Sequence, residues 1–170
     1  MASGLTLLLV GATGAVGRAV LEQTLDKREI RRIIAPTLRP LSRRAAKLNN
    51  PVLDLGTLTG DEDFWACDAV ICTLGTTIRA AGSQAEFARI DRDLPILIGR
   101  FARAAGATGY ALNSSLGASA TGNFYLRTKA EAEQGIIDLG FAGTTLVRPS
   151  LIDAERERAR PAEHLGVLFA

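Results

Sequence analysis

A tyrosine and a lysine four residues apart form the pair in this sequence best suited to proton transfer. Tyr125 and Lys129 lie in "FYLRTKAEAEQGIIDLG" (124–140), whose apolar spacing predicts a helix, so the two side chains share one face. A lysine ammonium beside a phenol stabilises the phenolate, which suits the tyrosine for giving up a proton. The alternative is a surface tyrosine next to a solvated lysine.

Two serines precede this helix at the end of a predicted strand. The stretch "TGYALNSS" (108–115) has strand character and ends at Ser114 and Ser115. Ligands of parallel sheets bind at the carboxyl ends of the strands. A serine hydroxyl there would polarise a substrate carbonyl while Tyr125 delivers a proton and a cofactor delivers hydride. Which of the two serines does so stays open.

A glycine-rich turn follows the first apolar run of the chain. Three glycines with the spacing G-x-x-G-x-x-G separate "LTLLLVGA" (5–12) from a helical stretch (15–27). Such a turn lets the N–H groups at the start of a helix hold a pyrophosphate. The alternative is a purely structural connection, since the best-known dinucleotide motif is G-x-G-x-x-G. We predict a cofactor-binding loop made of Gly11, Ala12, Thr13, Gly14, Ala15, Val16 and Gly17.

The second predicted strand indicates which dinucleotide is bound. No acid occurs from Ile30 to Leu53, and Arg39 lies just past the strand, with Arg43 and Arg44 close behind. Arginine binds the 2′-phosphate of NADP, whereas an NAD site typically carries an acid for the ribose hydroxyl. We therefore predict NADP(H), the alternative being a solvated basic loop. Asp54, at the end of the third predicted strand, is either an acceptor for the adenine amino group or a turn residue.

The elements that must position these residues alternate along the chain. Strands are expected at 5–12, 30–37, 50–56, 68–75, 108–115 and 143–152, and helices at 15–27, 61–66, 84–106 and 124–140, with a kink at Pro95 in the third. The alternation predicts an α/β fold, a doubly wound parallel sheet of the Rossmann type. The 170 residues are expected to form a single domain, 1–170, with a C-terminal substrate part that is short or missing.

Composition narrows the class of protein. The chain is 47% apolar and 22% charged with a net charge of +2, which argues against nucleic-acid or membrane partners. Cys67, Cys72 and the single histidine, His164, form no metal-ligand pattern, so no metal is predicted. Free thiols suit a reducing compartment, and no apolar run approaches the roughly 18 residues of a membrane span. These features predict a cytoplasmic protein.

Several strings together resemble the atypical branch of the short-chain dehydrogenase/reductase superfamily. They are "GATGAVG" (11–17), "CTLGTTIRAAGS" (72–83), "FARIDRDL" (87–94), "SSLGASATGNFYLRTKAEAE" (114–133) and "LVRPSLI" (146–152). Within that branch the chain is similar to the Tat-interacting-protein-like group, whose bacterial members are often called nucleoside-diphosphate-sugar epimerase-like or NAD(P)H-binding proteins. The likeness covers essentially the whole chain, although relatives generally continue for some tens of residues more.

The resemblance implies an NADPH-dependent oxidoreductase acting on an unknown small carbonyl substrate. Tyr125 would be the catalytic acid and Lys129 the ribose anchor. The residues implied to contact the cofactor elsewhere are Arg39 at the 2′-phosphate, Leu74 and Gly75 beside the fourth strand, and Ile152 and Arg160 near the nicotinamide.

The resemblance also leaves other functions open. A sugar-nucleotide epimerase is a variant that the short C-terminal region disfavours. The group includes a protein discussed as a regulator of transcription and nuclear import, so a cofactor-binding sensor with a protein partner and little turnover is the alternative from another class. Domains of this kind often pair through exposed helices, which makes a homodimer possible.

Overall fold

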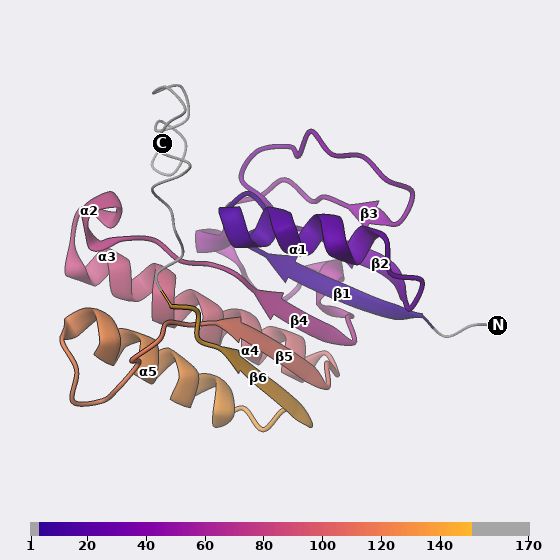
Figure 1. Ribbon diagram of the computed structural model, residues 1–170. Coiled ribbons are helices and arrows are strands. Elements are labelled where there is room, and N and C mark those ends of the chain that lie inside the picture. The colour runs from indigo at the N-terminus through magenta and orange to yellow at the C-terminus, as the bar shows by residue number, and fades with distance from the viewer. Residues whose placement is uncertain (1–3, 151–170) are drawn as a thin grey trace.

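The computed structural model describes residues 4–150, which form a six-stranded sheet with helices on both faces (Figure 1). All neighbouring strands are parallel, in the order β3-β2-β1-β4-β5-β6. This confirms the predicted doubly wound α/β fold. The strands are β1 (Leu5–Val10), β2 (Ile30–Ile34), β3 (Leu48–Asn49), β4 (Ala69–Cys72), β5 (Gly109–Asn113) and β6 (Gly143–Val147).

The helices divide between the two faces of the sheet. Helix α1 (Ala15–Leu25) packs on one face, where Leu21 contacts Leu9 and Ile33 in one buried cluster. Helices α4 (Leu94–Ala104) and α5 (Phe124–Ile137) cover the other face and form the larger cluster (Figure 1). Strand β1 is buried from its second residue to its last, which is why it reads as a continuous apolar run. The order of the strands reverses between β1 and β4, where ligands of such sheets bind.

The third strand is shorter than the sequence indicates. The predicted strand at 50–56 was wrong, because β3 spans only Leu48–Asn49 and a single bridge joins Thr37 to Val52 beyond it. Pro51 has no N–H group to donate to the sheet. Asp54 then accepts a hydrogen bond from the Gly56 N–H at 2.7 Å and begins the short 3-10 helix η1 (Leu55–Thr57).

The expected helix at 84–106 differs from the prediction in the middle. Helix α3 (Gln84–Ala88) continues through a π-helical segment, η3 (Arg89–Asp93), into α4. Pro95 lies in the first turn of α4 rather than at a kink. It lacks the N–H that would bond the Asp91 carbonyl, and its ring would collide with that group, so the wider turn accommodates it. As a consequence the Asp91 side chain turns into the protein, where it is buried.

Two shorter elements complete the described part. Helix α2 (Ile78–Ala81) follows β4 and was not predicted, and the expected helix at 61–66 is the 3-10 turn η2 (Asp63–Trp65). Between residues 4 and 150 no helix combines the length and the apolar character needed to cross a membrane.

Candidate functional site

The three glycines of the turn after β1 have different structural roles. Gly11 has a φ of +87°, a conformation that favours glycine, and a Cβ on Gly17 would lie 2.0 Å from the Gly11 carbonyl oxygen. Gly14 has an ordinary φ of −73°, and a Cβ there would meet only the Gly11 oxygen, at 3.5 Å. The fold therefore requires glycine at 11 and 17, whereas the space over Gly14 is open.

The start of helix α1 is left without side-chain partners. Its N-cap is Gly14, no side chain caps it, and its first turn contains no acid. The N–H groups of residues 15–17 therefore have no partner within the helix, and the helix dipole adds positive potential there. Thr13 is exposed, and its carbonyl accepts a hydrogen bond from Arg18 Nε at 2.8 Å, while Ala12 is buried in the core. This arrangement suits an anion such as a pyrophosphate.

A cavity of about 460 Å³ lies beside this turn. Its wall includes three arginines from separate elements, namely Arg18 of α1, Arg39 after β2 and Arg89 of η3. Leu74, after β4, also lines the cavity. The volume of the cavity falls in the range of small-molecule sites. Arg39 was predicted from the sequence. Arg18 was missed although it directly follows the turn, and nothing in the sequence pattern places Arg89 there.

Neighbouring charged residues are not equivalent to Arg39. Arg43 forms an ion pair with Glu22, with 3.2 Å between Nε and Oε1, and neither Arg43 nor Arg44 lines the cavity. Asp54 lines the cavity and is also a turn residue, because its Oδ1 accepts the Gly56 N–H. Of the three arginines in the predicted basic loop, Arg39 lines the cavity, and Arg43 and Arg44 do not.

The predicted Tyr125–Lys129 pair comes together in the first turns of α5. Asn123 caps this helix by accepting the Leu126 N–H at 3.0 Å. Lys129 Nζ lies 5.9 Å from the centre of the Tyr125 ring, which packs 5.4 Å from the ring of Phe87 in α3. Tyr125 is half-buried and Lys129 is buried, so the solvated alternative for the lysine was wrong.

A third residue, Asp91 of η3, joins this pair and was missed by the sequence analysis. Its Oδ1 lies 2.6 Å from Lys129 Nζ, and its Oδ2 accepts the Thr76 N–H at 2.9 Å. Burial raises the pKa of the Asp91 carboxyl, and the nearby Lys129 charge only partly offsets this. Gly75 lies over the pair, since a Cβ on it would be 3.6 Å from Asp91 Oδ1 and 3.8 Å from Lys129 Nζ.

The two candidate serines have different environments. Ser114 is buried, and its Oγ has no hydrogen-bond partner among the described residues. Ser115 is half-buried, and its Oγ makes only a long 3.4 Å contact with the Leu116 carbonyl. Ser115 is therefore the more accessible of the two.

A second acidic residue of α5, Glu133, is also paired. Its carboxylate accepts two hydrogen bonds from Arg148, at 2.8 and 2.5 Å, just after β6. Burial would raise the pKa of Glu133, but the bonds from Arg148 outweigh it and hold that pKa below its ordinary value. Two predicted contacts, Ile152 and Arg160, lie outside the described residues. Within residues 4–150 no group of histidine, cysteine and acidic side chains could hold a metal ion.

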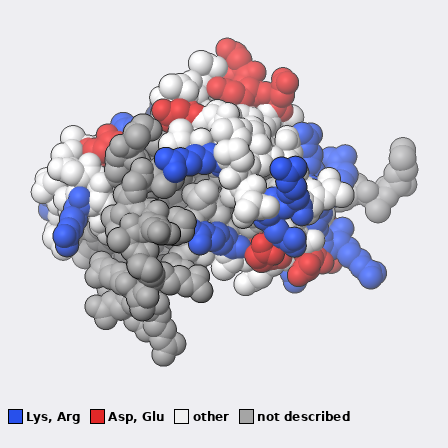
Figure 2. Space-filling view, turned by 90° about the horizontal axis from the view of Figure 1, so that it is seen from above, with Lys and Arg blue, Asp and Glu red and all other residues white. Residues whose placement is uncertain are grey.

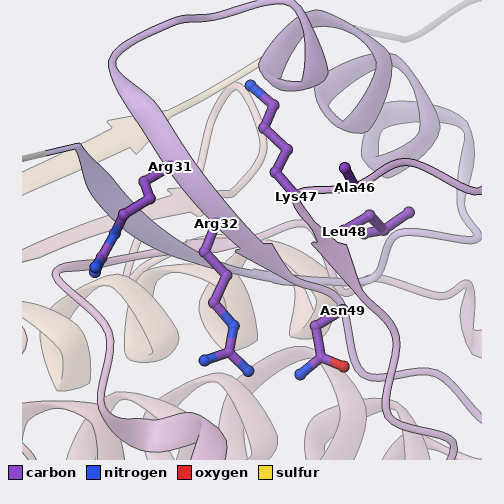
Figure 3. A pocket seen from close by; sticks show the side chains of 6 residues that line it. All are labelled: Arg31, Arg32, Ala46, Lys47, Leu48 and Asn49. Atoms are coloured by element: carbon purple, nitrogen blue, oxygen red, sulfur yellow. The ribbon is translucent and has the colours of Figure 1, made fainter.

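A second hollow of about 350 Å³ lies at the β2–β3 edge of the sheet. Figure 3 shows Arg31 and Arg32 projecting from β2 toward the bottom of the view and Lys47 extending toward the top. Figure 2 shows lysines and arginines gathered at the right of the view. Lys47 Nζ donates to the carbonyls of Lys27 and Ile30, and Arg31 Nη2 donates to Thr6 Oγ1. Charged side chains of this kind protect an edge strand from pairing with another chain.

Comparison with known proteins identifies relatives along nearly the whole chain. It is 37% identical over 175 residues to the mitochondrial protein fmp52 of Emericella nidulans, covering 95% of this chain and 73% of the relative. It is 32% identical over 171 residues to protein HTATIP2 of Rattus norvegicus, covering 96% and 69%. The chain belongs to the Fmp52/HTATIP2 family of atypical short-chain dehydrogenase/reductases. No family model matches the chain.

Solved structures with this fold include enzymes bound to NAD. MoeE5 in complex with UDP-glucuronic acid and NAD has a TM-score of 0.70 at 18% identity, covering 84% of this chain and 54% of that one. The UDP-glucuronic acid 4-epimerase of Bacillus cereus, with UDP-glucuronic acid and NAD, has a TM-score of 0.69 at 10% identity, covering 85% and 56%. This family member therefore spans about half the length of those two enzymes, and the likeness concerns the fold.

One prediction is corrected by the relatives. A cytoplasmic protein was expected, because the free thiols suit a reducing compartment and no apolar run approaches the length of a membrane span. The relatives from Emericella nidulans, Aspergillus clavatus, Aspergillus fumigatus and Meyerozyma guilliermondii are all named mitochondrial. Composition and cysteine content do not distinguish two reducing compartments, so they could not support that expectation.

Proposed function

We propose that this protein is an NADPH-dependent oxidoreductase that reduces a small carbonyl compound. The observation that carries the proposal is the cavity beside the glycine turn, which Arg18 and Arg39 both line. Arg39 follows β2, in the region where NAD-binding sites hold an acid. Guanidinium groups bind phosphate by two parallel hydrogen bonds, so they favour the 2′-phosphate of NADP. The solved structures of the same fold bind NAD, and the choice of NADP is the part specific to this chain.

The residues present fit a dinucleotide cofactor. The open space over Gly14 allows close approach of a pyrophosphate, and the unpaired N–H groups of α1 would hold it. Arg39 would bind the 2′-phosphate, and Gly75 leaves room next to Lys129 for the ribose. When bound, the reduced nicotinamide supplies hydride to the substrate carbon.

The chain's own residues would supply the proton and the orientation. Tyr125 would donate its phenolic proton to the developing alkoxide oxygen, with the Lys129 ammonium stabilising the resulting phenolate. A serine hydroxyl would polarise the carbonyl, and the accessibility of Ser115 favours it over the buried Ser114. The substrate would approach across the carboxyl edges of β4 and β5, where these side chains meet.

Parallel titrations of the protein with NADPH and NADH test this function. We expect tighter binding of NADPH, and we expect Arg39→Ala to weaken it by on the order of tenfold or more while NADH affinity stays the same. The matched control is Arg43→Ala, which removes an arginine that faces Glu22 instead of the cavity. Equal binding of the two cofactors, or equal losses in the two variants, would contradict the assignment of NADP.

A further inference from the structure

We propose that Asp91 is a positioning residue, a fixed counter-charge that holds the Lys129 ammonium between Tyr125 and Gly75. The proposal rests on the function proposed above, because it explains how the ribose anchor is kept charged and in place. Asp91 does not contact Tyr125 in any described hydrogen bond, so its action would pass through Lys129.

The geometry is that of a buried pair with few alternatives. Side-chain exposure is 7% for Lys129 and 0% for Asp91, and the Nζ–Oδ1 distance is 2.6 Å. Neither charge has ready access to water, so each depends on the other for compensation. Oδ1 has no further partner, whereas Oδ2 is fixed by the Thr76 N–H. The Thr76 N–H, in the segment after β4, therefore fixes one oxygen of the carboxylate, and the other oxygen contacts the Lys129 ammonium.

The backbone of η3 determines where this carboxylate lies. A π turn at a functional site is a common departure from the regular helix. In a continuous α-helix, the positions after 88 would be rotated about the axis, and the side chain of residue 91 would leave its place opposite α5. Arg89, the first residue of η3, lines the cavity. The segment therefore contributes one residue to the cavity and one to the pair with Lys129.

A stabilising role alone does not account for the pair. Buried ion pairs are weak contributors to stability, because the cost of removing both charges from water offsets much of their attraction. A hydrophobic pair of similar size would serve packing as well. A charged pair beside Gly75, after the carboxyl end of β4, is better explained by the need for a cation at that position.

Other titratable groups around the pair are already neutral or compensated. Cys72 of β4 faces it, and burial raises the pKa of this thiol, so it stays protonated. Glu133, one turn along α5 from Lys129, is bonded to Arg148. Tyr125 approaches Lys129 through its ring. Among the described residues, Asp91 is therefore the carboxylate that directly compensates Lys129.

The chain's three lysines allow a direct test by NMR with carbon-13 in the lysine side chains. Lys27 and Lys47 supply the two reference signals. In Asp91→Asn, we expect the chemical shifts of the Lys129 side chain to change by more than those of Lys27 and Lys47, because the buried ammonium has lost its counter-charge. Asp93→Asn is the matched control, since Asp93 is exposed and pairs with Arg92 instead. Unchanged Lys129 chemical shifts in Asp91→Asn would overturn the proposal.

A double-mutant cycle on NADPH affinity tests the route of action. We expect Asp91→Asn to weaken NADPH binding by on the order of tenfold, and to have no further effect in a Lys129→Met background. The same loss in both backgrounds would mean that Asp91 acts independently of the lysine, against the proposal. If Asp91→Asn fails to fold, restored folding in the double variant supports an uncompensated ammonium as the cause; continued failure contradicts it.

Failure of the proposed function would look different. If the wild-type protein bound neither NADPH nor NADH, the oxidoreductase function would be lost. The Lys129 chemical shifts would still report, without any cofactor, whether Asp91 contacts the lysine.

Discussion

Buried polar groups differ between the two ends of the strands, the carboxyl edge and the amino edge of the sheet. At the carboxyl edge, two buried side-chain oxygens, Thr76 Oγ1 and Ser114 Oγ, have no hydrogen-bond partner within residues 4–150, and a third, Asp91 Oδ1, contacts only the Lys129 ammonium. The start of α1 at the same edge also lacks a side-chain cap. Buried polar groups are normally satisfied, and exceptions require an explanation. A ligand that supplies the missing partners is the explanation that also fits the topology.

The amino edge shows the opposite pattern. The Thr6 N–H donates to Asp68 Oδ2 at 2.6 Å, and Lys47 Nζ donates to two backbone carbonyls. Glu62 accepts from the Thr59 and Gly60 N–H groups and from Trp65 Nε1. The hollow of Figure 3 lies at the β2–β3 side of the sheet, where Lys47 and Arg31 already have partners. A hollow lined by cations is therefore not by itself evidence of a binding site. Buried polar groups without partners, as at the carboxyl edge of the sheet, are better evidence of one.

The largest effects are expected from two glycines of the turn after β1. Gly17→Ala should lower the free energy of unfolding by about 3 kcal/mol, because its Cβ would overlap the Gly11 carbonyl. Gly14→Ala should change stability by less than about 1 kcal/mol, because the space above it is open. It should nevertheless weaken NADPH binding at least on the order of tenfold, because the methyl group would occupy the space proposed for the pyrophosphate.

Denaturant unfolding and NADPH titration measure the two effects separately. Gly14→Ala is the more informative of the two variants, because it should perturb the proposed ligand site without perturbing the fold. Unchanged NADPH affinity in Gly14→Ala would mean that the open space at the carboxyl edge is not a phosphate site.

The elements of this fold could be predicted because each leaves a local pattern. The apolar run of β1, the helical spacing of α5 and the glycines between β1 and α1 are all read from contiguous residues. Tyr125 and Lys129 could be paired for the same reason, since they are neighbours on one helix. Strand β3 could not be bounded, because Pro51 and the side chain of Asp54 end the pairing by interactions that strand propensity does not contain.

Residues that meet only in three dimensions left no such pattern. Asp91 reaches Lys129 because the helix widens into a π turn before Pro95. The spacing of apolar residues in the sequence does not reveal such a turn. Arg89 lines a cavity most of whose other residues come from distant segments, so its contribution could not be predicted from its neighbours in the sequence. Arg39 could be singled out only by its distance from β2, and the pairing of Arg43 with Glu22 is what separates the two arginines.

An intermediate effect is expected at the amino edge, from Glu62→Gln. Burial would raise the pKa of Glu62, but hydrogen bonds from Thr59, Trp65 and Gly60 lower it from 4.5 to about 2. A lowered carboxyl pKa contributes stability above the unfolded value, and this is lost as pH falls from about 4.5 towards 2. Glu62→Gln should cost about 1 kcal/mol at neutral pH, discounted for partial exposure, and the difference should vanish near pH 2.

Unfolding at a series of pH values measures this contribution. Asp61→Asn is the control, because the Asp61 carboxylate forms no described hydrogen bond or ion pair. A loss for Glu62→Gln that does not depend on pH would show that the amino edge is stabilised by packing of this loop, with the charge of Glu62 contributing little.

The smallest effect is expected from removing an unpaired hydroxyl at the carboxyl edge. Ser114→Ala should leave the free energy of unfolding within about 0.5 kcal/mol of wild type or raise it, because it removes a buried oxygen that has no partner. The matched change is Thr24→Val near the end of α1. Thr24 Oγ1 donates to the Val20 or Leu21 carbonyl, at 2.8 and 3.0 Å, so its loss should cost about 1 kcal/mol. Equal costs in denaturant unfolding would mean that Ser114 is as well satisfied as Thr24, and the contrast between the two edges would lose one of its two unpaired hydroxyl groups.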